Sequence, residues 1–338
     1  MSMPRREMGL AEERRHRGLT SSHEALQGVM DEAAATQFAF RAPEAFLSRL
    51  DLANPNDPLL RQVLPVAQEN QEMSGFGVDP TQEWSKRETP RLIRKYPNRA
   101  LLLVTDECPI HCRYCFRRHF PYPGHAGGMG DLAPALAAIA ADTHIAEVIL
   151  SGGDPLMASD GLLAQLLAAL ATIDHVRLVR IHTRVPVVWP QRLRPGLLAV
   201  LEALALPKVM VIHANHAQEL DGPAAEALAA LRASGLVLLN QSVLLKGIND
   251  HIDVLCALSW RLGELGVVPY YLHQLDAVAG AAHFQVEQVR AVALHHAMRA
   301  GLPGHLVPRL VQDQGLTTGK TWLPEDRDAW ADWPGEAG

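Results

Sequence analysis

The sequence has no long hydrophobic run and no excess of positive charge. No stretch of about 18 apolar residues occurs in the 338-residue chain, so we expect no membrane-spanning helix. The net charge of −6 and the pI of about 6.2 argue against a general binder of nucleic acid or of anionic membranes. Basic residues can still gather locally around an acidic ligand.

The N-terminal stretch has the arginines of a targeting peptide but not its other features. Residues 1–17 carry Glu7, Glu12 and Glu13 and lack the apolar core of a secretory signal. The acidic residues also disfavour a transit peptide. We therefore expect a cytoplasmic protein.

Cysteine is scarce, and its placement excludes a disulfide framework. Three of the four cysteines lie within residues 108–115, whereas Cys256 is remote. In a reducing compartment such a cluster indicates thiols kept free to bind a metal or metal cluster.

The sequence divides into three parts. Residues 1–90 are predicted to be a mostly helical N-terminal region, in which Ser21 and Glu24 have the spacing of a capping box. Residues 91–310 alternate short apolar runs with Ala/Leu-rich helical stretches. Residues 311–338 form a C-terminal loop and tail.

The central part predicts six strand–helix units. Nearly continuous apolar strands joined by helices favour a parallel sheet, either closed toward a barrel or open and doubly wound. In both architectures ligands bind at the carboxyl ends of the strands. The predicted strands are 100–104, 146–150, 177–182, 208–213, 236–243 and 267–272, and the predicted helices are 131–141, 160–171, 192–204, 223–234, 252–266 and 285–300.

The stretch "CPIHCRYCFRRHF", residues 108–120, follows the first of these strands. Cys108, Cys112 and Cys115 have the spacing C-x3-C-x2-C, which suits three corners of a 4Fe–4S cluster with one iron left open. The alternative is a structural zinc site with His111 or His119 as the fourth ligand. The position of the three cysteines at a strand end favours the cluster over the zinc site.

This motif is the signature of the radical S-adenosylmethionine superfamily, and the chain resembles the lysine 2,3-aminomutase family within it. Among its members it is most similar to the shorter enzymes of the elongation factor P β-lysylation pathway. The resemblance implies a partial (β/α)6 TIM-like barrel over residues 91–310 with a helical N-terminal extension. The blocks that carry it are "NPNDPLLRQVL", "RALLLVTDECPIHCRYCFRRHFPY", "SGGDPLM", "RIHTRVPV", "LLNQSVLLKGIND", "PYYLHQLDAVAGAAHF" and "LVPRL…GKT".

The resemblance implies a radical isomerase that converts L-α-lysine to β-lysine. A 4Fe–4S cluster with S-adenosylmethionine starts the reaction through a 5′-deoxyadenosyl radical, and pyridoxal phosphate assists the 1,2-migration of the amine. A reducing electron donor such as flavodoxin or ferredoxin is implied as a partner. So is a functional link to a lysyl-tRNA-synthetase-like ligase and elongation factor P. The alternative is a catabolic aminomutase of free lysine or of another amino acid.

The resemblance also assigns roles to residues near the strand ends. The three cysteines 108, 112 and 115 are expected to bind the cluster. The residues expected to contact S-adenosylmethionine are Ser151, Gly152, Gly153, Asp154, His213 and Gln241.

Pyridoxal phosphate and the substrate lysine need charged partners. The resemblance places Lys320 as the cofactor's attachment point, with Lys95, Tyr96 and Arg99 on its phosphate. It places Arg117 on the substrate carboxylate, and Asp276 and Asp313 on the side-chain ammonium. Burying two carboxylates together is costly without a cation between them, which agrees with a cationic substrate.

Overall fold

The computed structural model describes residues 19–20, 26, 28–124, 128–313, 315 and 320–323. Over these ranges no helix is long and apolar enough to cross a bilayer. Ser21 and Glu24, the predicted capping box, lie outside the described residues.

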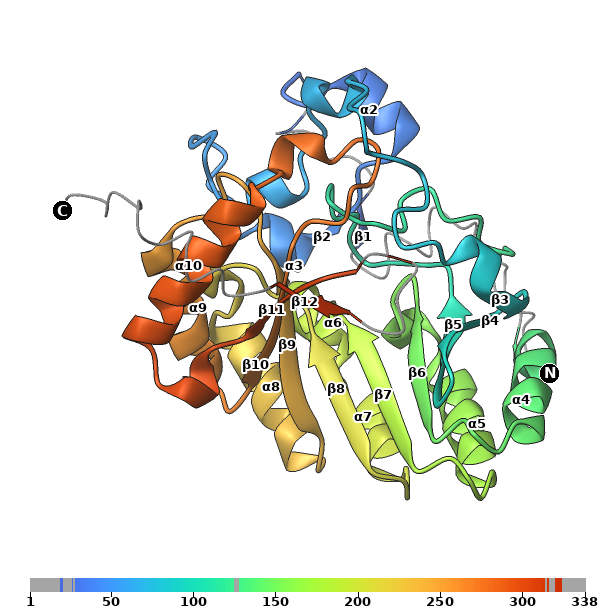
Figure 1. Ribbon diagram of the computed structural model, residues 1–338. Coiled ribbons are helices and arrows are strands. Elements are labelled where there is room, and N and C mark those ends of the chain that lie inside the picture. The colour runs from blue at the N-terminus through green and yellow to red at the C-terminus, as the bar shows by residue number, and fades with distance from the viewer. Residues whose placement is uncertain are drawn as a thin grey trace, which may run out of the picture.

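A single ten-stranded sheet forms the centre of the molecule (Figure 1). Its strands follow one another in chain order from β3 at one edge to β12 at the other, and the run from β5 to β11 is parallel. The parallel strands are β5 (Arg99–Thr105), β6 (Glu147–Gly152), β7 (Leu178–Thr183), β8 (Lys208–Ile212), β9 (Val237–Val243), β10 (Val268–His273) and β11 (Arg309–Gln312). The antiparallel edge strands are β3 (Arg87–Thr89), β4 (Leu92–Tyr96) and β12 (Thr321–Trp322).

Helices connect the parallel strands, as the alternation in the sequence predicts. In Figure 1, α7 and α8 lie behind the strands, and α4 and α10 flank the two ends of the row. Ser159 and Asp221 start α5 and α8 by accepting backbone N–H groups that the first turn leaves free. The helices are α4 (Met129–Ala141), α5 (Asp160–Ala171), α6 (Val185–Val188), α7 (Pro195–Glu202), α8 (Gly222–Ala233), α9 (Ile252–Glu264) and α10 (Gln288–Gly301).

The predicted α/β class with a parallel sheet is confirmed, and each predicted strand is found within two residues of its expected bounds. The sequence reading missed the antiparallel hairpin of β3 and β4 and the last two strands, because these are short and flank polar turns. Among the described residues no pairing joins β3 to β12, so the sheet is open. Its expected curvature into a partial barrel stays a prediction.

The N-terminal region lies beyond the arrowheads of the parallel strands (Figure 1). Its described part holds only two short α-helices, α2 (Glu32–Gln37) and α3 (Glu44–Leu47), three short 3-10 helices and a small pair of strands, β1 (Leu19–Thr20) and β2 (Ala42–Pro43). Turns separate them, since the stretch "NPNDP" cannot continue a helix. The region is therefore less helical than the sequence suggested, and its boundary near residue 90 stays a prediction.

A buried carboxylate fastens this region to the loop that carries the cysteines. Glu69 accepts hydrogen bonds from Arg113 (2.6 and 2.8 Å) and from Arg118 (2.8 Å), and all three side chains are fully buried. Arg113 also donates to the backbone oxygens of Phe38 and Ala34. Two cations therefore depend on one anion for their neutralisation.

We expect Glu69→Gln to destabilise the fold strongly. Removing the anion leaves two buried guanidinium groups unpaired, and breaking a buried pair in this way costs about 3–5 kcal/mol. The free energy of unfolding from urea titration measures the loss. Glu72→Gln, at an exposed position, is the matched control and should change it by less than about 0.5 kcal/mol. Equal values for the two variants would contradict this role of Glu69.

Candidate functional site

The cysteine loop begins where β5 ends, at the edge of the sheet that all parallel strands share. Cys108, Cys112 and Cys115 are half-buried and unpaired by disulfides. Burial raises the pKa of Cys115 to about 11 and that of Cys108 well above its ordinary value, and the neighbouring thiols add to both effects. The Cys108 and Cys115 thiols are therefore protonated at neutral pH until a metal group displaces the protons.

The three cysteines stay the predicted ligands of a 4Fe–4S cluster, and the two histidines of the zinc alternative have other partners in the structure. Within the described ranges, no three His, Cys, Asp or Glu side chains are grouped so as to hold one metal ion. The two histidines considered as a fourth zinc ligand are turned to other partners. His111 Nδ1 lies 2.6 Å from the oxygen of Ala39, and His119 Nε2 lies 3.1 Å from the oxygen of Ala279.

Arg117 is buried beside this loop and is held by a carboxylate. Its Nε and Nη2 donate to the two oxygens of Glu83 at 2.7 and 2.9 Å, and its Nη1 donates to Ser151 Oγ at 2.9 Å. Burial opposes the charge, but Glu83 raises the pKa of Arg117 above its ordinary value. Its Nη1 also donates to the backbone oxygen of Gly152 at 3.5 Å, so one of the five N–H donors of the guanidinium, on Nη2, is left over.

The glycines after β6 allow two backbone segments to touch. Gly152 has a φ of +122°, and the N–H of Gly153 donates to the oxygen of Thr105 at 2.7 Å. A Cβ on Gly153 would lie 2.3 Å from the oxygen of Glu107, the residue before the first cysteine. In this structure the two glycines therefore allow the chain to approach itself, and their expected contact with S-adenosylmethionine stays a prediction.

Asp154 joins two strand ends. Its buried carboxylate accepts from Thr183 Oγ1 at 2.8 and 2.9 Å and from the backbone N–H of Arg184 at 2.7 Å. Burial raises its pKa despite these hydrogen bonds. In this structure the carboxylate thus holds β6 to β7, and its expected role toward S-adenosylmethionine stays a prediction.

Lys320 lies in a group of alternating charges with Asp313 and Lys95. Asp313 is 3.6 Å from Lys320 Nζ and 2.9 Å from Lys95 Nζ. Burial would raise the pKa of Asp313, but the two lysines lower it, whereas burial lowers the pKa of Lys320. A lysine amine whose pKa is lowered is a better nucleophile toward a carbonyl carbon.

Asp276 is the second carboxylate of this group, and the described residues show no ion pair for it. Burial raises its pKa to about 7, although Lys320 pulls it down. Its Oδ1 is buried without a hydrogen-bond partner among the described residues. The site therefore holds an acceptor that a cationic ligand could occupy.

Three histidines line the neighbouring strand ends. His213 Nε2 is 3.0 Å from Gln241 Nε2, so the two residues that the sequence grouped together are in contact. Burial lowers the pKa of His213 to about 3 and those of His182 and His273 well below their ordinary values, and the charge of Lys320 adds to all three shifts. The ring atoms His182 Nε2 and His273 Nε2 are buried and unpartnered within the described part of the chain.

These neutral, unpaired ring nitrogens next to Lys320 are suited to hydrogen bonds with a polar ligand such as pyridoxal phosphate. Arg180 Nε is a further buried donor for which the described residues supply no acceptor. Arg99 stacks on the Tyr96 ring at 3.7 Å, while the Lys95 ammonium is engaged by Asp313 and by the oxygen of Thr81. The predicted phosphate contacts of these three residues stay predictions.

The sequence reading missed several residues of this site. Glu83 belongs to no motif, and the resemblance assigns no role to Arg184, His182 or His273, although all three stand in the blocks that carry it. Glu83 meets Arg117 across 34 positions of the sequence, so only the fold brings the two together. His182 and His273 could have been suspected, because each ends a predicted strand at the ligand-binding edge.

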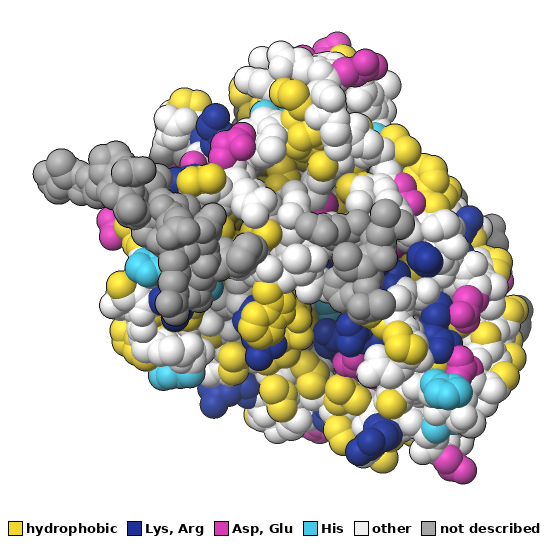
Figure 2. Space-filling model, in the orientation of Figure 1, with side chains coloured by type: hydrophobic (Ala, Val, Ile, Leu, Met, Phe, Trp, Pro, Cys, Tyr) yellow, Lys and Arg dark blue, Asp and Glu magenta, His cyan; other side chains and the backbone are white. Residues whose placement is uncertain are grey.

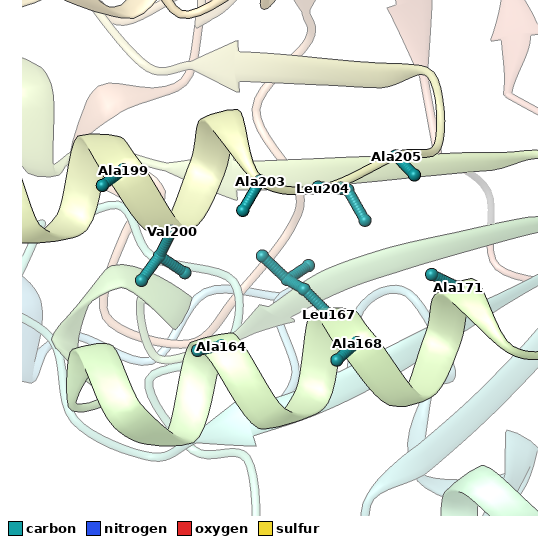
Figure 3. A pocket seen from close by; sticks show the side chains of 9 residues that line it. All are labelled: Ala164, Leu167, Ala168, Ala171, Ala199, Val200, Ala203, Leu204 and Ala205. Atoms are coloured by element: carbon teal, nitrogen blue, oxygen red, sulfur yellow. The ribbon is translucent and has the colours of Figure 1, made fainter.

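Two surface features lie apart from this geometry. An apolar groove between α5 and α7 is lined only by Ala, Leu and Val side chains (Figure 3). Figure 2 shows Lys and Arg side chains spread over one face of the molecule, near its centre and at its edges, with acidic side chains among them.

Comparison with known proteins adds an independent finding. The 4Fe-4S single cluster domain family matches residues 98–180. The L-lysine 2,3-aminomutase of Haemophilus influenzae is 43% identical over 87% of this chain and 87% of its own length. That of Escherichia coli is 45% identical over 86% and 85%, and that of Clostridium subterminale is 37% identical over 82% and 66%. A radical SAM methyltransferase from Sphaerobacter thermophilus shares 16% identity over 68% of this chain and 71% of its own, with a TM-score of 0.48.

We expect Gly153→Ala to loosen the cysteine loop. The added Cβ would overlap the backbone of Glu107, and overpacking of this kind costs about 1–3 kcal/mol. Iron bound per chain after anaerobic reconstitution and the free energy of unfolding should both fall. Gly161→Ala, whose Cβ would meet nothing within 4 Å at the start of α5, is the control and should preserve both. Unchanged iron content in Gly153→Ala would refute the close packing.

Proposed function

We propose a function from one established premise: the chain belongs to the L-lysine 2,3-aminomutase family. Our proposal is that it converts L-α-lysine to β-lysine in the cytoplasm. The observation that carries it is the meeting, at one sheet edge, of the three-thiol loop, Lys320 and the carboxylates Asp276 and Asp313. Relatives at 43–45% identity carry that activity in their names, which supports the assignment.

Each cofactor has residues to hold it. Cys108, Cys112 and Cys115 would bind a 4Fe–4S cluster, and Lys320 would bind pyridoxal phosphate through Nζ. When bound, the cluster with S-adenosylmethionine supplies a 5′-deoxyadenosyl radical, and pyridoxal phosphate enables the lysine amine to migrate from Cα to Cβ. An external low-potential electron donor of the flavodoxin or ferredoxin type would reduce the cluster.

The protein's own side chains would orient the substrate by its two charged ends. Arg117 would present its remaining Nη2 donor and its positive charge to the carboxylate, and Glu83 would keep the guanidinium in place. Asp276 and Asp313 would accept from the ammonium at the far end. The bound lysine would then lie between fixed charges of opposite sign, so both ends define its position.

We further propose that the β-lysine serves the modification of elongation factor P through a lysyl-tRNA-synthetase-like ligase. The sequences of the two stretches "FRRHFPY" and "GAAHF" support this assignment over a catabolic aminomutase. The substrate and the reaction would be the same in both settings.

Mass spectrometry of the product tests the reaction directly. Anaerobic incubation of the reconstituted protein with lysine, S-adenosylmethionine, pyridoxal phosphate and dithionite should yield β-lysine. Cys112→Ala should abolish both product and cleavage of S-adenosylmethionine, because the cluster loses a ligand. Cys256→Ala, which changes a remote cysteine in α9, should preserve both. Absence of β-lysine from a wild-type protein with a full cluster would refute the proposed function.

The role of Asp276 predicts a pH dependence. Its pKa of about 7 means that the carboxyl is neutral below that pH and ionised above it. Because the ammonium needs the ionised form, kcat/KM for lysine should rise with pH through about 7 in the wild type. Asp276→Asn should remove this rise and lower kcat/KM at pH 8 by about ten- to a hundredfold, since a charge-assisted hydrogen bond contributes about 1.5–3 kcal/mol.

Two controls make this test specific. Norleucine has no side-chain ammonium, so any turnover of norleucine should change little in Asp276→Asn. Asp174→Asn, at an exposed position, should leave the lysine profile unchanged. Equal losses for lysine and norleucine in Asp276→Asn would show that this aspartate does not read the side chain.

A further inference from the structure

Arg184 follows the last residue of β7 and reaches the cysteine loop. The side chain is buried, and its Nη1 donates to Cys112 Sγ at 2.7 Å. Neither the reaction nor the substrate contacts proposed above require this arginine.

The guanidinium is fixed by two further partners. Its Nη2 donates to Gln62 Oε1 at 2.6 Å and to Glu219 Oε2 at 2.7 Å. Glu219 is itself fully buried and accepts from the backbone N–H groups of Asn215 and His216 at 2.8 and 3.0 Å. The arginine is therefore aimed at the sulfur by groups from the N-terminal region and from the segment after β8.

The same network fixes the loop from its other side. Asn215 Nδ2 donates to Tyr114 Oη at 2.6 Å and to Gln62 Oε1 at 3.0 Å. Tyr114 lies between the second and third cysteines. An arginine guanidinium is not deprotonated in proteins, so Arg184 is a cation, and it is paired with the carboxylate of Glu219.

We propose that Arg184 is a positioning residue that orients the Cys112 sulfur and raises the reduction potential of the cluster bound there. The inference rests on the proposed function only in assuming that the three cysteines hold a 4Fe–4S cluster. Uptake of one electron from an external reductant adds one negative charge to a buried group. A cation hydrogen-bonded to a ligand sulfur stabilises that charge, and such hydrogen bonds are among the factors that set cluster potentials.

The test is the midpoint potential of the reconstituted cluster in three variants, measured by a mediated dithionite titration followed by EPR. Arg184→Gln removes the charge and retains an N–H donor, whereas Arg184→Lys retains the charge and loses the fork. Arg49→Gln is the matched control. Arg49 is half-buried, donates to the backbone oxygens of Glu219 and Val187 and pairs with Asp221, but makes no thiol contact that the structure records.

We expect the potential to fall in the order wild type, Arg184→Lys, Arg184→Gln, with Arg49→Gln equal to the wild type. A potential of Arg184→Gln that equals that of the wild type would overturn the proposal, as would an equal shift in Arg49→Gln. If Arg184→Gln does not fold, Arg184→Lys decides, since a potential unchanged from the wild type refutes the role and a lower one supports it. A wild-type protein that binds no cluster would instead refute the proposed function, so the two failures are distinguishable.

Discussion

The site's shape depends on the ion pairs that the buried carboxylate of Glu69 forms with Arg113 and Arg118. The cysteine loop has turns but no regular secondary structure to hold it. Glu69 pairs with two arginines of that loop, and Arg118 in turn donates to the oxygen of Gly280 on the far side. One anion thus ties the loop to the N-terminal region and, through Arg118, to the segment after β10.

The charges at the strand ends are nearly balanced before any ligand binds. Arg117 is neutralised by Glu83, and Asp313 lies between Lys95 and Lys320. Asp276 stays outside these pairs, and its pKa of about 7 reflects the cost of ionising a buried carboxyl group. Lysine carries two ammonium groups and one carboxylate, so its side-chain ammonium would bring a positive charge that the unpaired Asp276 could neutralise.

The repeated strand–helix pattern could be predicted because each strand is a short apolar run and each helix repeats its apolar residues about every 3.6 positions. The cysteine motif and the residues at strand ends could be predicted because parallel strands bring their carboxyl ends together. The pairs Glu83–Arg117 and Arg184–Glu219 could not, since their members lie 34 and 35 positions apart and no spacing links them. The short turns in the described part of the N-terminal region could not be placed either, because tertiary contacts and not propensity determine them.

The position of the N-terminal region over the strand ends has a consequence for the order of folding. Arg49 contacts residues 138 to 172 positions further along the chain, and Phe46 packs in the same core as residues of α6 and α8. On a ribosome, these contacts of Arg49 and Phe46 therefore cannot form until residues up to about 221 have emerged. This part of the N-terminal region must wait for the middle of the chain before its packing is complete, and its apolar side chains remain open to misassociation during that interval.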